Sequence, residues 1–363
     1  MDTHCKKLLL LALVLLLGQS VAEAQDKVSK EISRSYSMTQ AGEFQLENKY
    51  GDVHIYGWEK DKIAVEIAIT VTYKKRDNAK ELLDRIRPII QHNGNFLTIA
   101  YEIEEKNSGF FAKLFEDANP FDFNKSNIQI DYTVHMPTKA KLDVSNTFGN
   151  VFIEDWKGKL KATIEHGDLY ISDNLNKADV VMKYGNLRGQ NFNYGSVEIK
   201  NGGLNLANSK SLRINSSGTD IILHTIGSLE IDSNKDNITL EEVNTIYGSL
   251  KFTTFQLERL GENTDLSLKI SDFRVSQIIN PNAEITLDQE SSEISLNVTN
   301  FEHRFDATVE EGLVRLPKSF ENINSKMLDK GKKLREIKAT YGKNTSGMIS
   351  ITGNKGVVLL KEL

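Results

Sequence analysis

The stretch Phe148-Gly149-Asn150-Val151-Phe152-Ile153 contains a phrase that recurs along the chain: an aromatic or polar residue, glycine, then Asp, Asn or Ser, then alternating apolar residues. Five more copies are Tyr50-Gly51-Asp52-Val53-His54-Ile55, His166-Gly167-Asp168-Leu169-Tyr170-Ile171, Tyr184-Gly185-Asn186-Leu187, Tyr194-Gly195-Ser196-Val197-Glu198-Ile199 and Tyr247-Gly248-Ser249-Leu250-Lys251-Phe252. Each copy predicts a turn followed by a β-strand, and its repetition is typical of repeat architectures.

The section from 140 to 312 carries most of these copies. Its apolar cores first recur at a constant step, at Val151, Leu169 and Leu187, and later at shorter and less regular spacings. No proline occurs between Pro137 and Pro281, as a continuous ladder of strand hydrogen bonds requires. We predict an all-β fold here, a single-stranded right-handed β-solenoid (β-helix-like) with two short strands in each rung of roughly eighteen to twenty-one residues. An antiparallel sandwich is the alternative, because it also shows short strands at close spacing.

The flanking sections have other patterns. Residues 25–139 are predicted to be β-rich, with a hairpin that turns between Trp58 and Asp61. Apolar residues at spacings of three and four predict one helix at about 77–90, capped by Asp77 or Asn78. Residues 313–363 lose the repeat, and we predict that they form C-terminal capping strands.

The first 24 residues resemble a cleaved signal peptide. Lys6 and Lys7 precede the apolar run from Leu8 to Leu17, and Ala22-Glu23-Ala24 has the small-residue pattern of a cleavage site. A membrane anchor is the competing interpretation, but the run is about half the length of a spanning helix. Cleavage would remove Cys5, the only cysteine, and would leave a mature chain without disulfides or a transmembrane segment.

An insert at 107–124 is rich in phenylalanine. Its aromatic residues are Phe110, Phe111, Phe115, Phe121 and Phe123. One interpretation is a cap that covers an exposed end of the repeat array. The other is an apolar surface that docks a protein partner or contacts lipid.

Catalytic and metal-binding signatures are absent from the sequence. The seven histidines are isolated from one another, and no phosphate-binding loop, Gly-x-Ser-x-Gly or His-Glu-x-x-His motif occurs. The acids Asp52, Asp168, Asp220 and Asp265 could pair across rungs to cleave a polysaccharide, but equivalent turns carry Asn or Ser. We therefore predict no enzyme activity, no cofactor and no metal. The net charge of -5 also argues against a nucleic-acid partner.

Aromatic residues precede the turn glycines at regular places. They are Tyr50, Phe148, Tyr184, Tyr194, Tyr247 and Tyr341. If the rungs align them, they form a stacked column, which either holds the rung spacing or offers a platform for sugar rings. The candidate ligand or partner surface therefore comprises Tyr184, Tyr194 and Tyr247, together with the five phenylalanines of the insert.

Three phrases of the chain resemble a known family. They are the stretch from Glu47 to Trp58, Val134-His135-Met136-Pro137 followed by Leu142 to Val144, and Asn146 to Ile153. They are similar to the bacterial "putative adhesin" domains of unknown function, which are exported β-solenoid proteins frequent in Gram-negative bacteria. The resemblance covers most of the mature chain, but its motifs specify turns and strands, so it assigns no functional residue. The phenylalanine-rich insert departs from the family pattern.

The expected function is that of a non-enzymatic binding or structural protein of the cell envelope, located in the periplasm, at the cell surface or outside the cell. The sequence does not specify its partner, for which a glycan and another envelope protein are the candidates. Two alternatives stay open at this point: a polysaccharide-binding or polysaccharide-cleaving protein that uses the solenoid face, and a scaffold that docks a protein through the insert.

Overall fold

The computed structural model describes residues 26–104, 127–343 and 346–363. The predicted signal peptide and the insert at 107–124 lie outside these residues. Within them the chain forms 26 strands and one helix, so the predicted all-β class is confirmed. None of the helical structure in the described ranges is long and apolar enough to cross a membrane.

The chain divides into two compact units. The first comprises Ala68–Arg87 and the described parts of Met1–Glu31 and Glu102–Gln129, and the second comprises Ile32–Ile67, Pro88–Tyr101 and Ile130–Leu363. Helix α2 lies within the first unit, and five strands belong partly to each unit. These elements are β1 (Asp26–Ser37), β4 (Lys62–Tyr73), α2 (Arg76–Arg85), β5 (Ile86–Asn93), β6 (Phe96–Ile103) and β7 (Ile128–Pro137).

Helix α2 is shorter than the predicted helix at 77–90. It begins after Lys75, which makes no side-chain cap, and buries Ala79 and Leu83. The predicted cap at Asp77 or Asn78 and the predicted extension beyond Arg85 are wrong, because residues 86–93 form β5. Pro88 explains the early end, since proline disfavours helical geometry in the residue before it and lacks the N–H that a helix needs.

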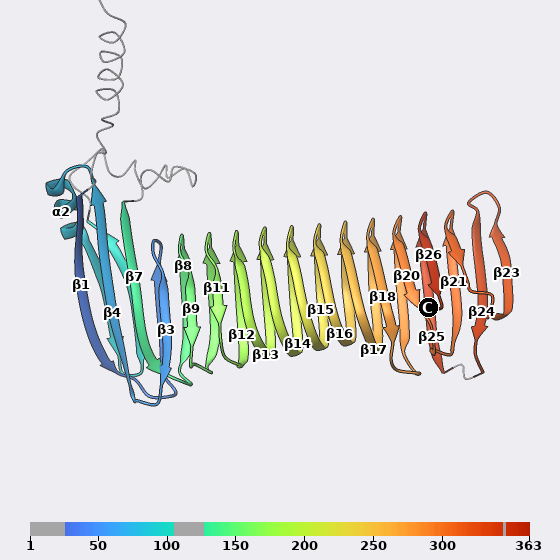
Figure 1. Cartoon of the computed structure of the whole chain (residues 1–363), viewed down its shortest axis with the longest axis horizontal. Helices are drawn as coiled ribbons and strands as arrows, with labels where there is room; N and C mark the ends of the chain where they lie inside the picture. The colour runs from blue at the N-terminus through green and yellow to red at the C-terminus, as the bar shows by residue number, and fades with distance from the viewer. Residues whose placement is uncertain (1–25, 105–126, 344–345) are drawn as a thin grey trace, which may run out of the picture. The chain divides into compact units, whose positions relative to one another are not determined.

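The second unit is built from strands that lie side by side in succession (Figure 1). They are β2 (Glu43–Asn48), β3 (Val53–Trp58), β8 (Lys141–Thr147), β9 (Val151–Glu154), β10 (Lys159–Glu165), β11 (Leu169–Ile171), β12 (Leu175–Lys183), β13 (Asn186–Lys200), β14 (Gly203–Ser217), β15 (Asp220–Asn234), β16 (Asn237–Lys251), β17 (Thr254–Lys269), β18 (Asp272–Ile278), β19 (Glu284–Glu290), β20 (Glu293–Asn297), β21 (His303–Glu310), β22 (Leu313–Arg315), β23 (Glu321–Asp329), β24 (Leu334–Tyr341), β25 (Gly347–Asn354) and β26 (Val357–Lys361).

Successive passes of the chain pair in parallel and in register. Leu142, Leu160 and Ala178 are direct neighbours, and further along Asn186 pairs with Gly203. Side-chain bonds between neighbouring passes accordingly join positions separated by 18 and later by 17. We call one such pass a rung. Inward-pointing residues alternate with outward-pointing ones along each strand, so the apolar residues of neighbouring rungs stack into one continuous core.

Each rung turns at a first corner, where one residue adopts the left-handed conformation. At Phe148, His166 and Tyr184 the φ angles are 58°, 54° and 56°. The N–H of each corner residue donates to a carbonyl of the next rung, as Phe148 does to Glu165 at 3.0 Å and His166 to Lys183 at 3.0 Å. At these three corners the residue before the glycine, and not the glycine itself, supplies the positive φ.

The corner glycines serve close approach instead. A Cβ atom on Gly167 would lie 1.9 Å from the carbonyl oxygen of Gly149, and one on Gly185 would lie 1.9 Å from that of Gly167. Every L-residue side chain begins with that atom, so glycine is the residue that fits this backbone approach without a shift. At later corners the residue that follows the left-handed residue is no longer glycine. Thr219 and Asp236 stand at this position, and their side chains are buried.

Both ends of the second unit are interleaved. Strand β3 pairs in parallel with β7 on one edge and β9 on the other, so the hairpin predicted around Trp58 to Asp61 is wrong. Near the other end, β25 lies between β19 and β21, and β26 lies between β20 and β22. Residues 347–361 are therefore an internal rung rather than capping strands. The alternation of apolar residues predicts where the strands lie. It does not predict which strands pair, because pairing partners that are distant in sequence leave no local pattern.

Gly167 provides a test of the corner geometry. We expect Gly167→Ala to destabilise the protein by about 2–3 kcal/mol or more, because its Cβ must displace the Gly149 carbonyl. The matched control is Gly94→Ala, at φ 59° with no atom near the new Cβ, which should cost only about 1–2 kcal/mol of left-handed strain. Urea unfolding measures the free energy of unfolding of both variants. Equal losses of stability would contradict the role of the close backbone approach at Gly167.

His303 provides a test at the other end. Its ring is buried against Phe301, Phe320 and Tyr341; burial lowers its pKa despite the 2.7 Å contact of Nδ1 with the Phe301 carbonyl. The unfolded chain then takes up a proton more readily than the folded one, so stability should fall as pH drops below about 6.5, by at most about 1.4 kcal/mol per pH unit. Thermal melts of His303→Phe should show a shallower loss between pH 7 and 5; parallel curves would refute the assignment.

Candidate functional site

In-register rungs place equivalent side chains about 4.8 Å apart, so the outer surface of the second unit is organised in columns. A side chain of one column can form a binding or catalytic site only with its neighbours in the same column or in the adjacent column.

The first corner carries an aromatic column of Tyr50, Phe148, His166 and Tyr184. The ring centroids are 5.8, 5.0 and 4.8 Å apart, and neighbouring planes are within 9° of parallel. This confirms the predicted stack for Tyr50, Phe148 and Tyr184 and adds His166. The rings cover one another's faces, so the stack holds the rung spacing, and Tyr184 at one end keeps an outer face.

Tyr194, Tyr247 and Tyr341 do not belong to this column. Tyr194 lies within β13 beside Lys177 and Ser211, and Tyr247 lies within β16 beside Glu230 and Asp265. Their phrases match the corner phrase by coincidence, because Gly195 and Gly248 lie inside strands rather than at the first corner. Tyr341 ends β24 and donates its hydroxyl to Glu362 at 2.7 Å.

The two strand tyrosines are exposed, with 55% of Tyr194 and 42% of Tyr247 accessible. Among the described residues no aromatic ring stacks on either of them. In this respect they differ from Tyr184, which is 51% exposed but stacked on His166. A ring on which no other ring stacks can offer either face to another ring system, whereas Tyr184, at the end of its stack, can offer only its outer face.

A second aromatic column was missed by the sequence analysis. His54, Phe152 and Tyr170 stack with centroids 4.6 and 5.0 Å apart, and the Arg188 guanidinium lies 5.6 Å from the Tyr170 ring centre. The signal was present, because each of these residues stands three positions after a glycine of the recurring phrase. As in the corner stack, the faces are largely occupied.

Between the two aromatic columns runs a ladder of Asp and Asn side chains. The Asn150 N–H donates to Asp52 Oδ1 at 2.7 Å, the Asp168 N–H to Asn150 Oδ1 at 2.9 Å, and the Asn186 N–H to Asp168 Oδ1 at 2.8 Å. Asp and Asn both supply Oδ1, which explains why the position alternates between them. Burial opposes ionisation of Asp168, but the hydrogen bonds from the Asn186 N–H, the Tyr170 hydroxyl and the Asn186 amide outweigh it and lower the carboxyl pKa.

The four acids considered for catalysis do not meet. Asn150 separates Asp52 from Asp168, and Asn186 and Gly203 separate Asp168 from Asp220. Asp265 lies elsewhere, beside Tyr247. In addition, no group of three or more His, Cys, Asp or Glu residues in the described ranges could hold a metal ion.

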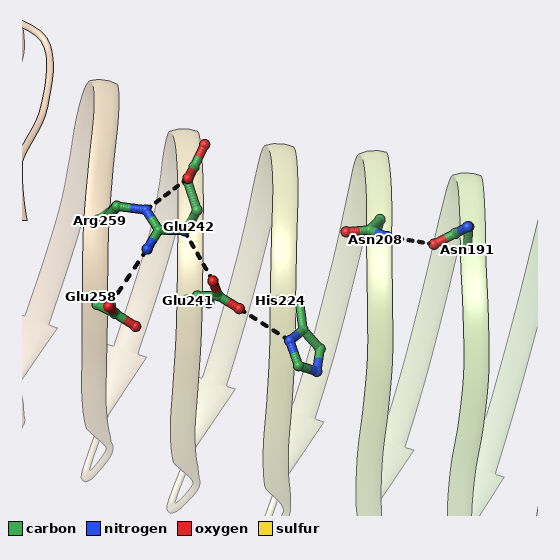
Figure 2. A network of polar contacts seen from close by, with 7 residues as sticks. All are labelled: Asn191, Asn208, His224, Glu241, Glu242, Glu258 and Arg259. Carbon is green, nitrogen blue, oxygen red and sulfur yellow. Dashed lines mark hydrogen bonds and ion pairs between the residues drawn. The ribbon is translucent and has the colours of Figure 1, made fainter.

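Asparagine side chains form two short ladders beside Tyr194, at the opposite turn of the rung, which we call the second corner. Asn191 Nδ2 donates to Asn174 Oδ1 at 2.6 Å, and Asn208 Nδ2 donates to Asn191 Oδ1 at 2.7 Å. Asn193 Nδ2 lies 3.4 Å from Asn176 Oδ1. Figure 2 shows Asn191 and Asn208 pointing toward each other from neighbouring rungs. Asn191, Asn193 and Asn208 each use one N–H in a ladder, so the second N–H of each amide is left to face solvent or a ligand.

Further along the second corner, charged side chains replace the amides. Arg259 bonds Glu242 at 2.8 Å and Glu241 at 3.0 Å, and Glu241 in turn contacts His224 Nδ1 at 3.1 Å (Figure 2). The hydrogen bond from Arg259, followed by that from His224, lowers the pKa of Glu241. An open hollow of about 520 Å³ lies beside this network. The charged groups of the network already pair with one another at the protein surface, where such ion pairs contribute little stability.

The remaining predicted surface, the phenylalanine-rich insert with Phe110, Phe111, Phe115, Phe121 and Phe123, lies outside the described residues. The candidate site of the described chain is therefore the exposed ring of Tyr194 with its neighbouring asparagines.

Comparisons with known proteins found no matching family model and no matching curated protein. Among solved structures, the chain is similar to a "putative adhesin" from Bacteroides fragilis, at 14% identity and a TM-score of 0.29, over 92% of this chain and 97% of that one. It is similar to a "putative cell adhesion protein" from Clostridium sporogenes, at 11% identity and a TM-score of 0.21, over 93% and 100%. It is also similar to a "putative lipid binding protein" from Parabacteroides distasonis, at 11% and 0.31, over 92% and 97%. At TM-scores this low, the likeness carries no inference about ligand or activity.

Proposed function

We propose that the chain is exported after removal of residues 1–24 and that it binds a glycan of the cell envelope without cleaving it. The second unit is proposed to be a right-handed β-solenoid. Support for the coil comes from the constant parallel register between successive rungs. Support for its hand comes from the general rule that crossovers between parallel strands of one sheet are right-handed.

The choice of ligand rests on Tyr194, which is 55% exposed, has no aromatic ring stacked on it among the described residues, and lies next to the asparagine ladders. A sugar presents an apolar C–H face and a rim of hydroxyls that both donate and accept hydrogen bonds. Tyr194 offers an apolar surface for the first, and Asn191, Asn193 and Asn208 offer paired donors and acceptors for the second.

The repeating surface favours an extended ligand over a small one. Because Asn174, Asn191 and Asn208 occupy one column, a polymer lying along it meets the same amide at each rung. Such a contact needs no deep cavity, and its affinity accumulates over several equivalent subsites. The absence of adjacent carboxylates among Asp52, Asp168, Asp220 and Asp265 supports binding without cleavage.

We expect Tyr194→Ala to weaken binding by about tenfold or more, the usual effect of truncating a central aromatic contact. The experiment is a glycan panel followed by calorimetric titration of the tightest ligand. Tyr184→Ala is the matched control, since that ring is about equally exposed but stacked; it should lower thermal stability and leave binding unchanged.

The results can contradict the proposal in three ways. Equal losses of affinity in both variants would show that Tyr194 is not the specific contact with the glycan. Failure of every glycan to bind would remove the ligand class, and release of reducing ends during incubation would show that the protein cleaves its ligand.

A further inference from the structure

The hairpin of β23 and β24 lies at one end of the second unit. Strand β24 pairs antiparallel with β21, and β23 pairs with β24 alone among the described residues. Every residue of β23 is exposed. The hairpin is thus the outermost element of its end of the unit, and its tip is open to contact with a large partner (Figure 1).

The tip is strongly basic in a chain with a net charge of -5. Residues 326–335 hold five basic side chains and one acid, a net charge of about +4 at neutral pH. The basic residues are Lys326, Lys330, Lys332, Lys333 and Arg335. Oδ1 of the acid, Asp329, accepts hydrogen bonds from the backbone N–H groups of Gly331 at 2.8 Å and Lys332 at 3.1 Å. Asp329 therefore stabilises the turn.

Most of this charge is not neutralised by the protein. Lys333 pairs with Glu311 at 3.4 Å, while Lys326, Lys330 and Lys332 make no ion pair within the described ranges. Long cationic side chains without partners, gathered at one turn, attract an anionic surface over a distance of roughly the Debye length, about 8–10 Å.

Apolar side chains stand among these cations. Met327 is 39% exposed, Leu328 45% and Ile323 55%, all on β23. Lysine on an edge strand is a common device against strand-to-strand aggregation, and that accounts for Lys326. It does not account for three lysines in the turn, nor for Met327 and Leu328, which the same device would exclude.

Cations and apolar side chains together fit one partner chemistry. A soluble polyanion gains from the lysines but nothing from Met327 or Leu328, whereas an anionic bilayer gains from both, through its headgroups and through its acyl boundary. We propose that the tip of the β23–β24 hairpin docks the protein on an anionic phospholipid surface. This does not depend on the proposed glycan binding.

The test uses the full chain and sedimentation with two kinds of vesicle, pure phosphatidylcholine and phosphatidylcholine containing phosphatidylglycerol. We expect binding to the second only, weakened by salt. Lys330→Glu with Lys332→Glu should reduce binding on the order of 1,000-fold, from about 1 kcal/mol per cation removed and a similar repulsion per anion added. The control pair Lys210→Glu and Lys251→Glu makes the same change of charge on exposed strand positions and should bind normally.

A second variant separates the bilayer from a soluble polyanion. Met327→Ser with Leu328→Ser should weaken vesicle binding several-fold while binding to heparin stays as it is. The proposal is overturned if the anionic vesicles are not bound, if the control pair loses as much as the tip pair, or if the serine variant binds vesicles normally. Circular dichroism melts confirm that each variant is folded.

Discussion

The backbone hydrogen bond across the first corner is the constraint on which the rest of the molecule depends. At the first corner of successive rungs a residue in the left-handed conformation donates its N–H to the neighbouring rung, from Phe148 near one end to Lys355 near the other. A non-glycine residue in this conformation costs about 1–2 kcal/mol, so the corners persist only because each completes a ladder on both sides. Proline is excluded from such a ladder, since it has no N–H to give.

This constraint acts on the backbone and leaves the corner side chain free. Phe, His, Tyr, Asn, Lys, Ile and Ser all occupy it, at positions including Phe148, Asn201, Lys235 and Ile270. Selection for the fold and selection for the surface are therefore nearly independent in this chain. A column can change from amide to hydroxyl to charged along one corner without disturbing the core, as the series Asn191, Asn208, Thr225, Glu242 and Arg259 shows.

Sequence reasoning found what repeats locally and missed what depends on distant pairing. The strands and the corner stack of Tyr50, Phe148 and Tyr184 could be predicted because they recur with the period of the rung. Tyr194 and Tyr247 were placed in the wrong column, since a short phrase cannot distinguish a corner from the interior of a strand. The neighbours of β3 and β25 come from distant parts of the chain, and no local pattern specifies them. The asparagine ladders were also missed, although Asn174, Asn191 and Asn208 recur at the constant separation of one rung.

The position of β25 and β26 has a consequence for the order of folding. Residues 347–361 lie between the rung of β19 and β20 and the rung of β21 and β22. The rung of β19 and β20 therefore cannot complete its strand pairing on this side until residues 347–361 are available to pair with it. Pairing of Asp288 with the distant Thr352 closes a long loop at the last moment, which makes this step slow relative to the stacking of adjacent rungs. A chain that folds from its N-terminal side would therefore leave one edge of the β19 and β20 rung unpaired, and open to exchange with solvent, until residues 347–361 dock on it.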